Sequence, residues 1–425
     1  MPLFSKLMTI LAIFLALLPS YIVLVQPVLM QAGDFLITFY PAGKLAQLGR
    51  IAEIYTPANM TTFINAPFDK FTHETFPAIA KSYVAIYMYS PLIALFFAPF
   101  ALLQAQASLI LWQLINVAAA VYCAWLFARP ALKEKIQDLT VIFLFCPIFH
   151  TLLIGQLGIL FGLLPLTLAY KFLLQRKEFL AGLVLGTLYM KPQFLPCALL
   201  VCGALFFTRR PKATAGLICG LAGMALLTVA LTGSDMLIAF WQSIKMSDTC
   251  YSCAGYRPAS AIITCLPAVI LQFFDFDARE KVKLYAYGGA ALIGLGALVY
   301  CIRLWRPVPN CIDKQPATQA YKQATALTFL IGLFVLPLVV PHFLFYDLCG
   351  LALMAFMVNT DVFDNQVRAK MLPLRKYLWW ICNLYYVGFS FFPVILMGPY
   401  YPLILVILLA VLLLLIVRVQ KPQQT

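Results

Sequence analysis

Long uncharged apolar runs constrain this chain more than any other feature of its sequence. The first runs from about Leu7 to Leu29, and a helix needs roughly 20 apolar residues to cross a bilayer. Similar runs recur until the last, from Tyr401 to Val417. Of the 425 residues, 63% are hydrophobic and 11% are charged, which leaves too little polar surface to cover a soluble globule. The sequence therefore predicts an all-α polytopic membrane protein with about 11–12 membrane-spanning segments.

The segment from about residue 31 to 106 interrupts this pattern. It mixes charged and aromatic residues, so we expect a large first extracytoplasmic loop with amphipathic helices. Pro91 to Leu103 is apolar but short for a full crossing, and we expect it to lie along the membrane face. The first apolar run, from about Leu7 to Leu29, could be a cleaved signal peptide. Its length and the lack of a small-x-small site before Gly33 favour a retained helix.

The net charge of +14 suggests either nucleic-acid binding or many cytoplasmic loops. The basic excess lies on short loops between apolar runs, such as Arg209-Arg210-Pro211-Lys212, where the positive-inside tendency requires it. Nucleic-acid binding therefore loses its main support. The same loops predict a multi-pass plasma (inner) membrane protein with cytoplasmic N- and C-termini and an extracytoplasmic active site.

Ionisable residues at the predicted outer face are the first functional candidates. Asp34 lies where the first membrane helix emerges, and Lys191 lies at the tip between two half-length apolar segments. Charges at membrane depth are costly unless something uses them. Pro192 breaks the helix beside Lys191, and irregular backbone in a membrane is tolerated only inside protein or beside a cavity. Gly155-Gln156 and the segment Pro341 to Asp347 end other spans on this face.

The spacing of the cysteines and the search for metal-binding motifs give little information about function. Most of the 12 cysteines stand singly in apolar runs, where thiols act as small hydrophobes. Only Cys250 and Cys253 come close together, in a polar loop, and they could form a disulfide, contribute to a zinc site or stay free. The sequence contains no nucleotide-binding loop, zinc signature or Gly-rich dinucleotide fingerprint.

Several short motifs occur together between the first predicted helix and about Leu353. They are Asp34-Phe35, Tyr40-x-Ala42-Gly43, Gly49, Tyr55, Tyr89-Ser90-Pro91-Leu92, Ala98-Pro99, Trp112, Asn116, Gly155-Gln156, Ala181-Gly182, Lys191-Pro192-Gln193, Pro341-His342 and Tyr346-Asp347-Leu348. In their order and spacing they resemble glycosyltransferase family 87, the polyprenol-phosphate-mannose-dependent transferases of the GT-C superfamily. One departure is Tyr89-Ser90-Pro91, where the family usually has consecutive prolines.

The resemblance implies a GT-C type bundle with a catalytic membrane domain at residues 1–358, completed by C-terminal transmembrane segments at residues 359–425. It also implies an inverting hexosyltransferase that moves a hexose, mannose above all, from a polyprenyl-phosphate donor to an envelope lipid or glycan acceptor on the extracytoplasmic face. Such a reaction needs a base for the acceptor hydroxyl and cations for the departing phosphate. No cofactor or metal site is expected, although Asp34 and Asp347 could in principle bind a divalent ion.

Roles for individual residues follow from the same resemblance. Asp34 would be the catalytic base and His342 its catalytic partner. The substrate-binding set would be Lys191, Gln193, Gln156, Arg257, Tyr40, Tyr346 and Asp347, with Lys191 and Arg257 as the cations.

Each assignment has a plainer alternative. Asp34 or His342 could cap a helix, and Asp347 could be a structural N-cap. Lys191 could pair with an intramembrane carboxylate. Arg257 could contact lipid headgroups, and the loop tyrosines could mark the membrane interface. A lipid-linked sugar flippase or transporter is the alternative function, but it would need paired broken helices in two similar halves, and only one broken pair is visible.

Overall fold

The computed structural model describes residues 3–26, 33–57, 60, 62–80, 83–127, 141–250, 262–274, 276–308, 317–391 and 398–419. Its long helices are α1 (Leu3–Val25), α5 (Ala105–Phe127), α11 (Lys212–Thr232), α12 (Ser234–Cys250), α14 (Phe276–Trp305), α15 (Gln319–Val339), α17 (Asn365–Phe391) and α18 (Tyr400–Val419).

Shorter helical segments complete the described part of the chain. They are η2 (Phe35–Phe39), α2 (Tyr40–Gln47), η3 (Ile51–Ile54), α3 (Pro67–Thr75), α4 (Pro91–Phe97), η4 (Phe100–Leu102), α7 (Cys146–Leu153), η5 (Ile159–Leu163), α8 (Leu164–Leu174), α9 (Glu178–Gly186), η6 (Thr187–Met190), η7 (Pro192–Phe194), α10 (Leu195–Phe207), α13 (Leu266–Leu271), η9 (Phe345–Ala352) and α16 (Leu353–Asn359).

The predicted all-α membrane class is confirmed. Within the described residues, six helices are long and apolar enough to cross a membrane, namely α1, α5, α11, α14, α15 and α18. Four further apolar stretches form shorter helices, at residues 159–174, 178–190, 192–207 and 345–358. The basic segment around Arg129 and the Cys250–Cys253 pair lie outside the part of the chain whose side chains are described.

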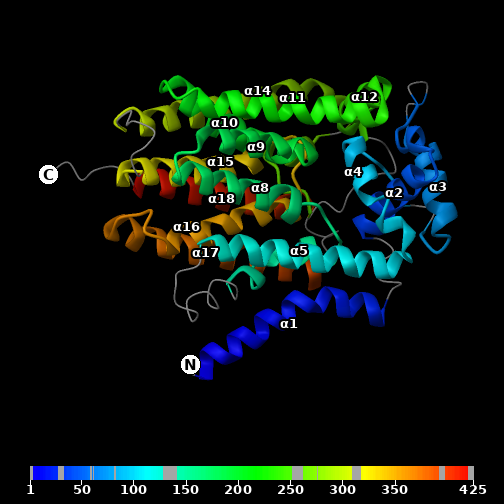
Figure 1. The fold of residues 1–425 in the computed structure, drawn as a ribbon, viewed down its shortest axis with the longest axis horizontal. Coiled ribbons are helices and arrows are strands. Elements are labelled where there is room, and N and C mark those ends of the chain that lie inside the picture. The colour runs from blue at the N-terminus through cyan, green and yellow to red at the C-terminus, as the bar shows by residue number, and fades with distance from the viewer. Residues whose placement is uncertain are drawn as a thin grey trace.

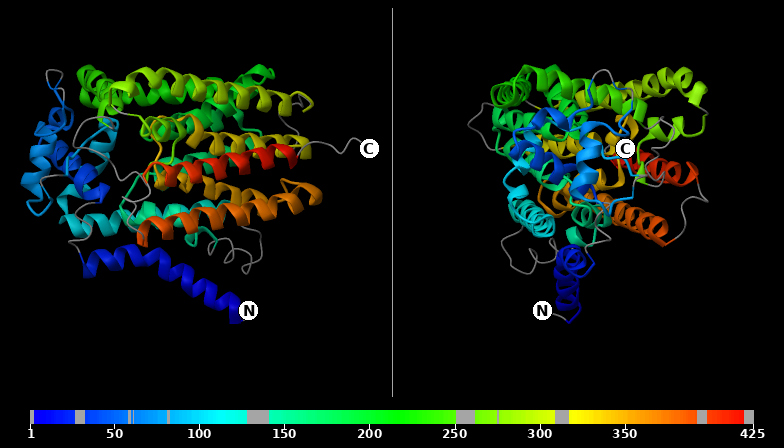
Figure 2. Two further views of the ribbon diagram at one scale, coloured as in Figure 1. Left: turned by 180° about the vertical axis from the view of Figure 1, so that it is seen from behind. Right: turned by 90° about the vertical axis from the view of Figure 1, so that its right-hand side faces the viewer.

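The bundle has a clear polarity along its long axis. Figure 1 shows most of the long helices running side by side, with α2, α3 and α4 gathered at one end and α12 at the same end. We call α2, α3 and α4 the cap. Both termini point away from it, as Figure 2 also shows. Helix α15 forms the centre, with 83% of its most apolar window buried, whereas the corresponding window of α14 is 17% buried. The periphery is thus left apolar and exposed, as a lipid environment requires.

The α4 segment does not cross the bundle. Its seven residues rise only about 10 Å at 1.5 Å per residue, which is a third of the hydrocarbon thickness. Ser90 begins the helix, and its hydroxyl accepts a hydrogen bond from the Leu92 N–H at 3.3 Å. The segment is therefore too short to span, and its placement along or dipping into the membrane face stays a prediction.

Glycines bring α9 and α11 into close contact. A Cβ atom added at Gly182 would lie 1.8 Å from the Ala213 carbonyl oxygen, and one at Gly216 would lie 2.1 Å from that of Phe179. Small residues spaced four apart allow this approach in membrane helices. The contact fixes α9, the helix that leads to Lys191.

Candidate active site

Asp34 immediately precedes η2, beneath the cap. It sits at the N-terminal end of a helical stretch that continues through α2, and its side chain is half-buried. The backbone here is anchored to the bundle, because the Phe35 N–H donates to the Ile154 carbonyl at 3.0 Å. Phe35 itself is fully buried and packs edge-on against Phe97, with ring centroids 5.5 Å apart. Asp34 is therefore held by its neighbours on both sides.

The turn after α7 brings Gln156 to Asp34. Gly155 adopts a left-handed φ of +70°, and an added Cβ would lie 2.5 Å from Cβ of Phe35, so this position requires glycine. The Gly155 carbonyl accepts a hydrogen bond from the Trp112 indole at 2.8 Å. Gln156 is buried, and its amide nitrogen donates a short hydrogen bond to Oδ2 of Asp34. The predicted meeting of these two segments is confirmed.

Lys191 occupies the break between η6 and η7, where its backbone leaves the helical region at φ −136° and ψ 75°. Its side chain has no exposed surface. The ammonium donates to Oε1 of Gln156 at 3.1 Å and lies 2.8 Å from Oδ1 of Asp347. One connected chain of polar groups thus runs from Asp34 through Gln156 and Lys191 to Asp347.

One of the plainer alternatives is confirmed alongside this arrangement, because Lys191 does pair with a carboxylate. Asp347 is not the N-cap of η9, which is Leu344. Asp347 is the third residue of the helix, and its Oδ2 accepts the Leu344 N–H at 3.0 Å. The hydrogen bond from the Leu344 N–H holds the Asp347 carboxylate, and the carboxylate in turn orients the Lys191 ammonium. With these contacts the Lys191 ammonium still lies next to Gln156 and remains a candidate site group.

Two tyrosine rings cover the ammonium. The nitrogen of Lys191 lies 5.0 Å from the ring centroid of Tyr346 and 5.7 Å from that of Tyr89, within the range of cation–π attraction. The Tyr89 hydroxyl also lies 3.4 Å from the amide nitrogen of Gln156. The Thr151 hydroxyl holds the backbone of Tyr346 by donating to its carbonyl at 3.0 Å. The cation is thus enclosed between aromatic faces.

Burial and charge set the protonation of the two groups predicted to handle protons. Burial raises the pKa of the Asp34 carboxyl above 3.8, while the hydrogen bond from Gln156 and the charge of Lys191 oppose the shift. A raised pKa makes the carboxylate a stronger base. The half-buried His342 has its pKa lowered to about 3, by burial and then by Lys191, so its imidazole is neutral at physiological pH.

A family model for glycosyltransferase family 87 matches residues 87–337, which is more than half of the chain. The chain belongs to glycosyltransferase family 87. No curated protein and no solved structure matches it significantly. Membership establishes the chain as a glycosyltransferase and favours that class over the flippase alternative.

The family 87 match covers only the middle of the polar chain. Tyr89, Gln156, Lys191 and Gln193 lie inside the matched residues, whereas Asp34 and the segment from His342 to Asp347 lie outside them. The contacts of Lys191 with Gln156 and Asp347 are what join the outer segments to the matched core.

Not every predicted residue joins this chain. The Tyr40 hydroxyl donates to the Leu103 carbonyl at 2.9 Å and its ring packs against Phe76, which are contacts within the loop structure. Gln193 lies two residues after Lys191 in η7, and its buried Oε1 has no hydrogen-bond partner among the described residues. Arg257 lies outside the described residues. Among those described, no three His, Cys, Asp or Glu side chains cluster as metal ligands would.

Tyr83 and Tyr89 were not among the predicted site residues. Burial, and to a lesser extent the charge of Asp34, raise the pKa of Tyr83 to about 12. Tyr83, Tyr87 and Tyr89 recur in one short extended segment before α4. That spacing was the available signal, because residues two apart on an extended chain share a face.

Proposed function

We propose that this glycosyltransferase moves a hexose, mannose being favoured by the family resemblance, from a polyprenyl-phosphate carrier to the hydroxyl of a lipid or glycan acceptor. The observation that carries the proposal is the fully buried Lys191 linked through Gln156 to Asp34. A cation and a carboxylate joined in this way match the two needs of the reaction. The basic loops at the other end of the apolar segments support an extracytoplasmic site in the plasma membrane.

Each residue has a defined task in the proposed reaction. The acceptor oxygen attacks the anomeric carbon and its proton passes to the Asp34 carboxylate. The bond between that carbon and the phosphate oxygen breaks, and the electron pair leaves with the phosphate, inverting the anomeric configuration. Lys191 stabilises the charge that develops on the phosphate, and Gln156 keeps base and cation in fixed relation.

Access to the cation requires a local movement. The ammonium of Lys191 has no exposed surface, and the rings of Tyr89 and Tyr346 cover it. The donor's phosphate therefore reaches Lys191 only when one of these rings turns aside. Because the phosphate is itself an anion, it can take over part of the charge compensation that Asp347 provides.

The test uses purified protein in lipid with a radiolabelled polyprenyl-phosphate mannose and crude envelope lipid as acceptor. Wild type and the surface control Asp235→Asn should transfer label to a new product, and Asp34→Asn should not. Normal transfer by Asp34→Asn would overturn the role of Asp34. Failure of wild type with every acceptor fraction, together with movement of the intact carrier across sealed vesicles, would overturn the proposed reaction.

A further inference from the structure

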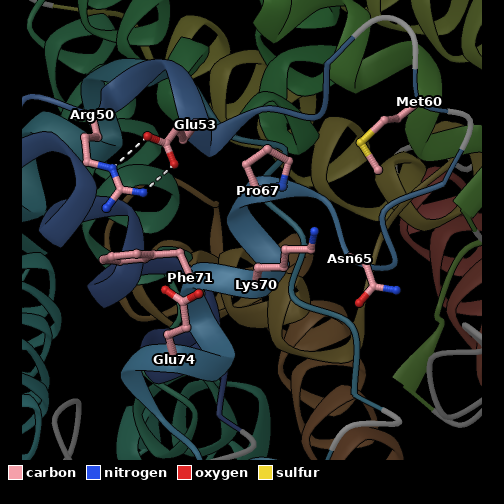
Figure 3. Close-up of a pocket in the computed structure, with 8 residues that line it drawn as sticks. All are labelled: Arg50, Glu53, Met60, Asn65, Pro67, Lys70, Phe71 and Glu74. Atoms are coloured by element: carbon pink, nitrogen blue, oxygen red, sulfur yellow. Dashed lines mark hydrogen bonds and ion pairs between the residues drawn. The ribbon is translucent and has the colours of Figure 1, made fainter.

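A second polar cavity lies in the cap region, apart from the Lys191 site. Its volume is about 390 Å³, within the usual range of small-molecule sites. Figure 3 shows its walls, formed by η3 and the residue before it, the loop preceding α3, and α3 itself. The lining residues are Arg50, Glu53, Met60, Asn65, Pro67, Lys70, Phe71 and Glu74. None of them belongs to the polar chain described above.

One side of the cavity is formed by an ion pair that packs on a buried ring. The Arg50 guanidinium forms two 2.7 Å hydrogen bonds with the Glu53 carboxylate, and it also lies 5.4 Å from the ring centroid of Phe71. Phe71 is buried, whereas the Arg50 and Glu53 side chains are 48% and 36% exposed and can reach a ligand. The bidentate geometry orients the guanidinium and the carboxylate relative to each other.

Further polar groups come from α3 and the loop before it. Lys70 and Glu74 protrude from α3 one turn apart, and the side chains of these two residues and of Asn65 have no hydrogen bond or ion pair within the described structure, although the charge of Glu74 acts on Arg50. Figure 3 shows the Lys70 side chain extending toward the loop that carries Asn65. The backbone of Asn65 is held, since its N–H donates to the buried Asp69 at 2.9 Å. Exposed donors and acceptors are therefore accessible to a ligand in the cavity.

The charges define the class of ligand. Two cations and two carboxylates line the cavity, so they cancel and favour neither a polyanion nor a polycation. Hydroxyl groups both donate and accept, and they satisfy ammonium, amide and carboxylate groups together. Met60, Pro67 and Phe71 supply apolar wall for the C–H faces of such a ligand. A neutral sugar combines these properties.

The cavity has a fixed relation to Asp34. Helical backbone runs from Asp34 through η2 and α2 to Gln47, which spans about 20 Å at 1.5 Å per residue, and Arg50 follows three residues later, after the turn at Gly49. A ligand that reaches both places is several sugar units long. Binding energy from parts of a substrate remote from the reacting atoms can be used to position the reacting hydroxyl.

We infer that this cavity binds a neutral sugar unit of a multi-sugar acceptor, at a distance from the hydroxyl that receives the hexose. Only the statement that the bound sugar belongs to an acceptor rests on the proposed function. The binding of a neutral saccharide can be measured without turnover.

The first experiment measures the binding of mannobiose to the full-length protein in lipid nanodiscs by saturation-transfer NMR. Lys70→Met/Glu74→Gln should weaken binding at least tenfold. The matched control Lys44→Met, on the same cap but with its ammonium bonded to Gln47 at 3.0 Å, should bind like wild type. Mannose 6-phosphate should not outcompete mannobiose. Equal affinity in the double variant, or preferred binding of the phosphorylated sugar, would overturn the inference.

The second experiment separates this inference from the proposed function. In the transfer assay, Lys70→Met/Glu74→Gln should raise the KM for a multi-sugar acceptor about tenfold while the KM for the donor stays within twofold. If wild type transfers no sugar with any acceptor and instead moves the intact carrier across sealed vesicles, the proposed reaction is wrong, and the mannobiose measurement still tests whether the cavity binds a sugar. If wild type transfers and the double variant keeps both constants and the mannobiose affinity, the cavity assignment alone is wrong.

Discussion

The ammonium nitrogen of Lys191 lies 2.8 Å from Oδ1 of Asp347, and both side chains are fully buried. A buried ion pair contributes little net stability, but removal of one partner leaves an uncompensated charge. This pair therefore ties the folding of the protein to the integrity of its site.

Loss of either charge alone should destabilise the protein. Lys191→Met leaves Asp347 without its cation, and we expect the free energy of unfolding to fall by about 3–5 kcal/mol. Lys191→Met/Asp347→Asn should regain most of that loss but remain inactive, because the cation is still missing. Thermal unfolding in detergent together with the transfer assay measures both effects. If the losses of unfolding free energy from Lys191→Met alone and from Asp347→Asn alone simply added up in the double variant, the two side chains would not be paired.

Removal of the Asp34 carboxylate should separate activity from stability. Loss of a general base lowers turnover roughly 100- to 10,000-fold. Burial raises the pKa of Asp34, so its charged form is unfavourable in the folded state, and stability due to this group falls as pH rises from 3.8 through the raised pKa. At pH 7, Asp34→Asn should therefore unfold at the same or a higher temperature than wild type. A lower unfolding temperature would show that the carboxylate is structural.

His342 should make the protein sensitive to acid. Its pKa is lowered from 6.5 to about 3. Between about pH 3 and pH 6.5 the imidazole is therefore protonated in the unfolded state but neutral in the folded state. The stability due to this group is complete above pH 6.5 and is lost as pH falls toward 3. His342→Gln should therefore show a smaller drop in unfolding temperature between pH 7.5 and pH 5. An unchanged drop would mean that His342 becomes protonated in the folded protein.

Two glycines of α11 make a matched test of helix contact. At Gly216 a Cβ would meet the Phe179 carbonyl oxygen at 2.1 Å, whereas at Gly223 it would meet nothing within 4 Å. We expect Gly216→Ala to destabilise the protein by about 1–3 kcal/mol, and Gly223→Ala to be neutral or slightly stabilising. Unfolding midpoints of the two variants decide this. Equal midpoints would argue against the close α9–α11 packing.

Part of the site was predictable from the sequence because charged residues in apolar surroundings are conspicuous. Asp34, Lys191 and Asp347 each interrupt or border a hydrophobic run, and the break at Pro192 was visible in the sequence. Their mutual contacts were not predictable. The choice of Asp347 over Asp34 as the direct partner of Lys191 depends on the position of η9 relative to η7, which helix packing decides.

The α9–α11 glycine contact and the cavity in the cap could not be predicted from the sequence. Gly182 and Gly216 stand in ordinary apolar helices, and only the packed structure shows that each faces a backbone carbonyl. Arg50 and Glu74 look like solvated surface charges in the sequence. Their shared cavity depends on how η3, Met60 and Asn65 lie relative to α3, which the sequence does not show.

The order of the segments also governs how the site forms during synthesis. Gln156 is 122 residues from Asp34 along the chain, and more than a third of the protein separates Lys191 from Asp347. Chains are made and inserted from the N-terminus, so Lys191 enters the membrane well before its carboxylate partner exists. A chain that ends before Asp347 therefore carries a Lys191 cation without its carboxylate partner.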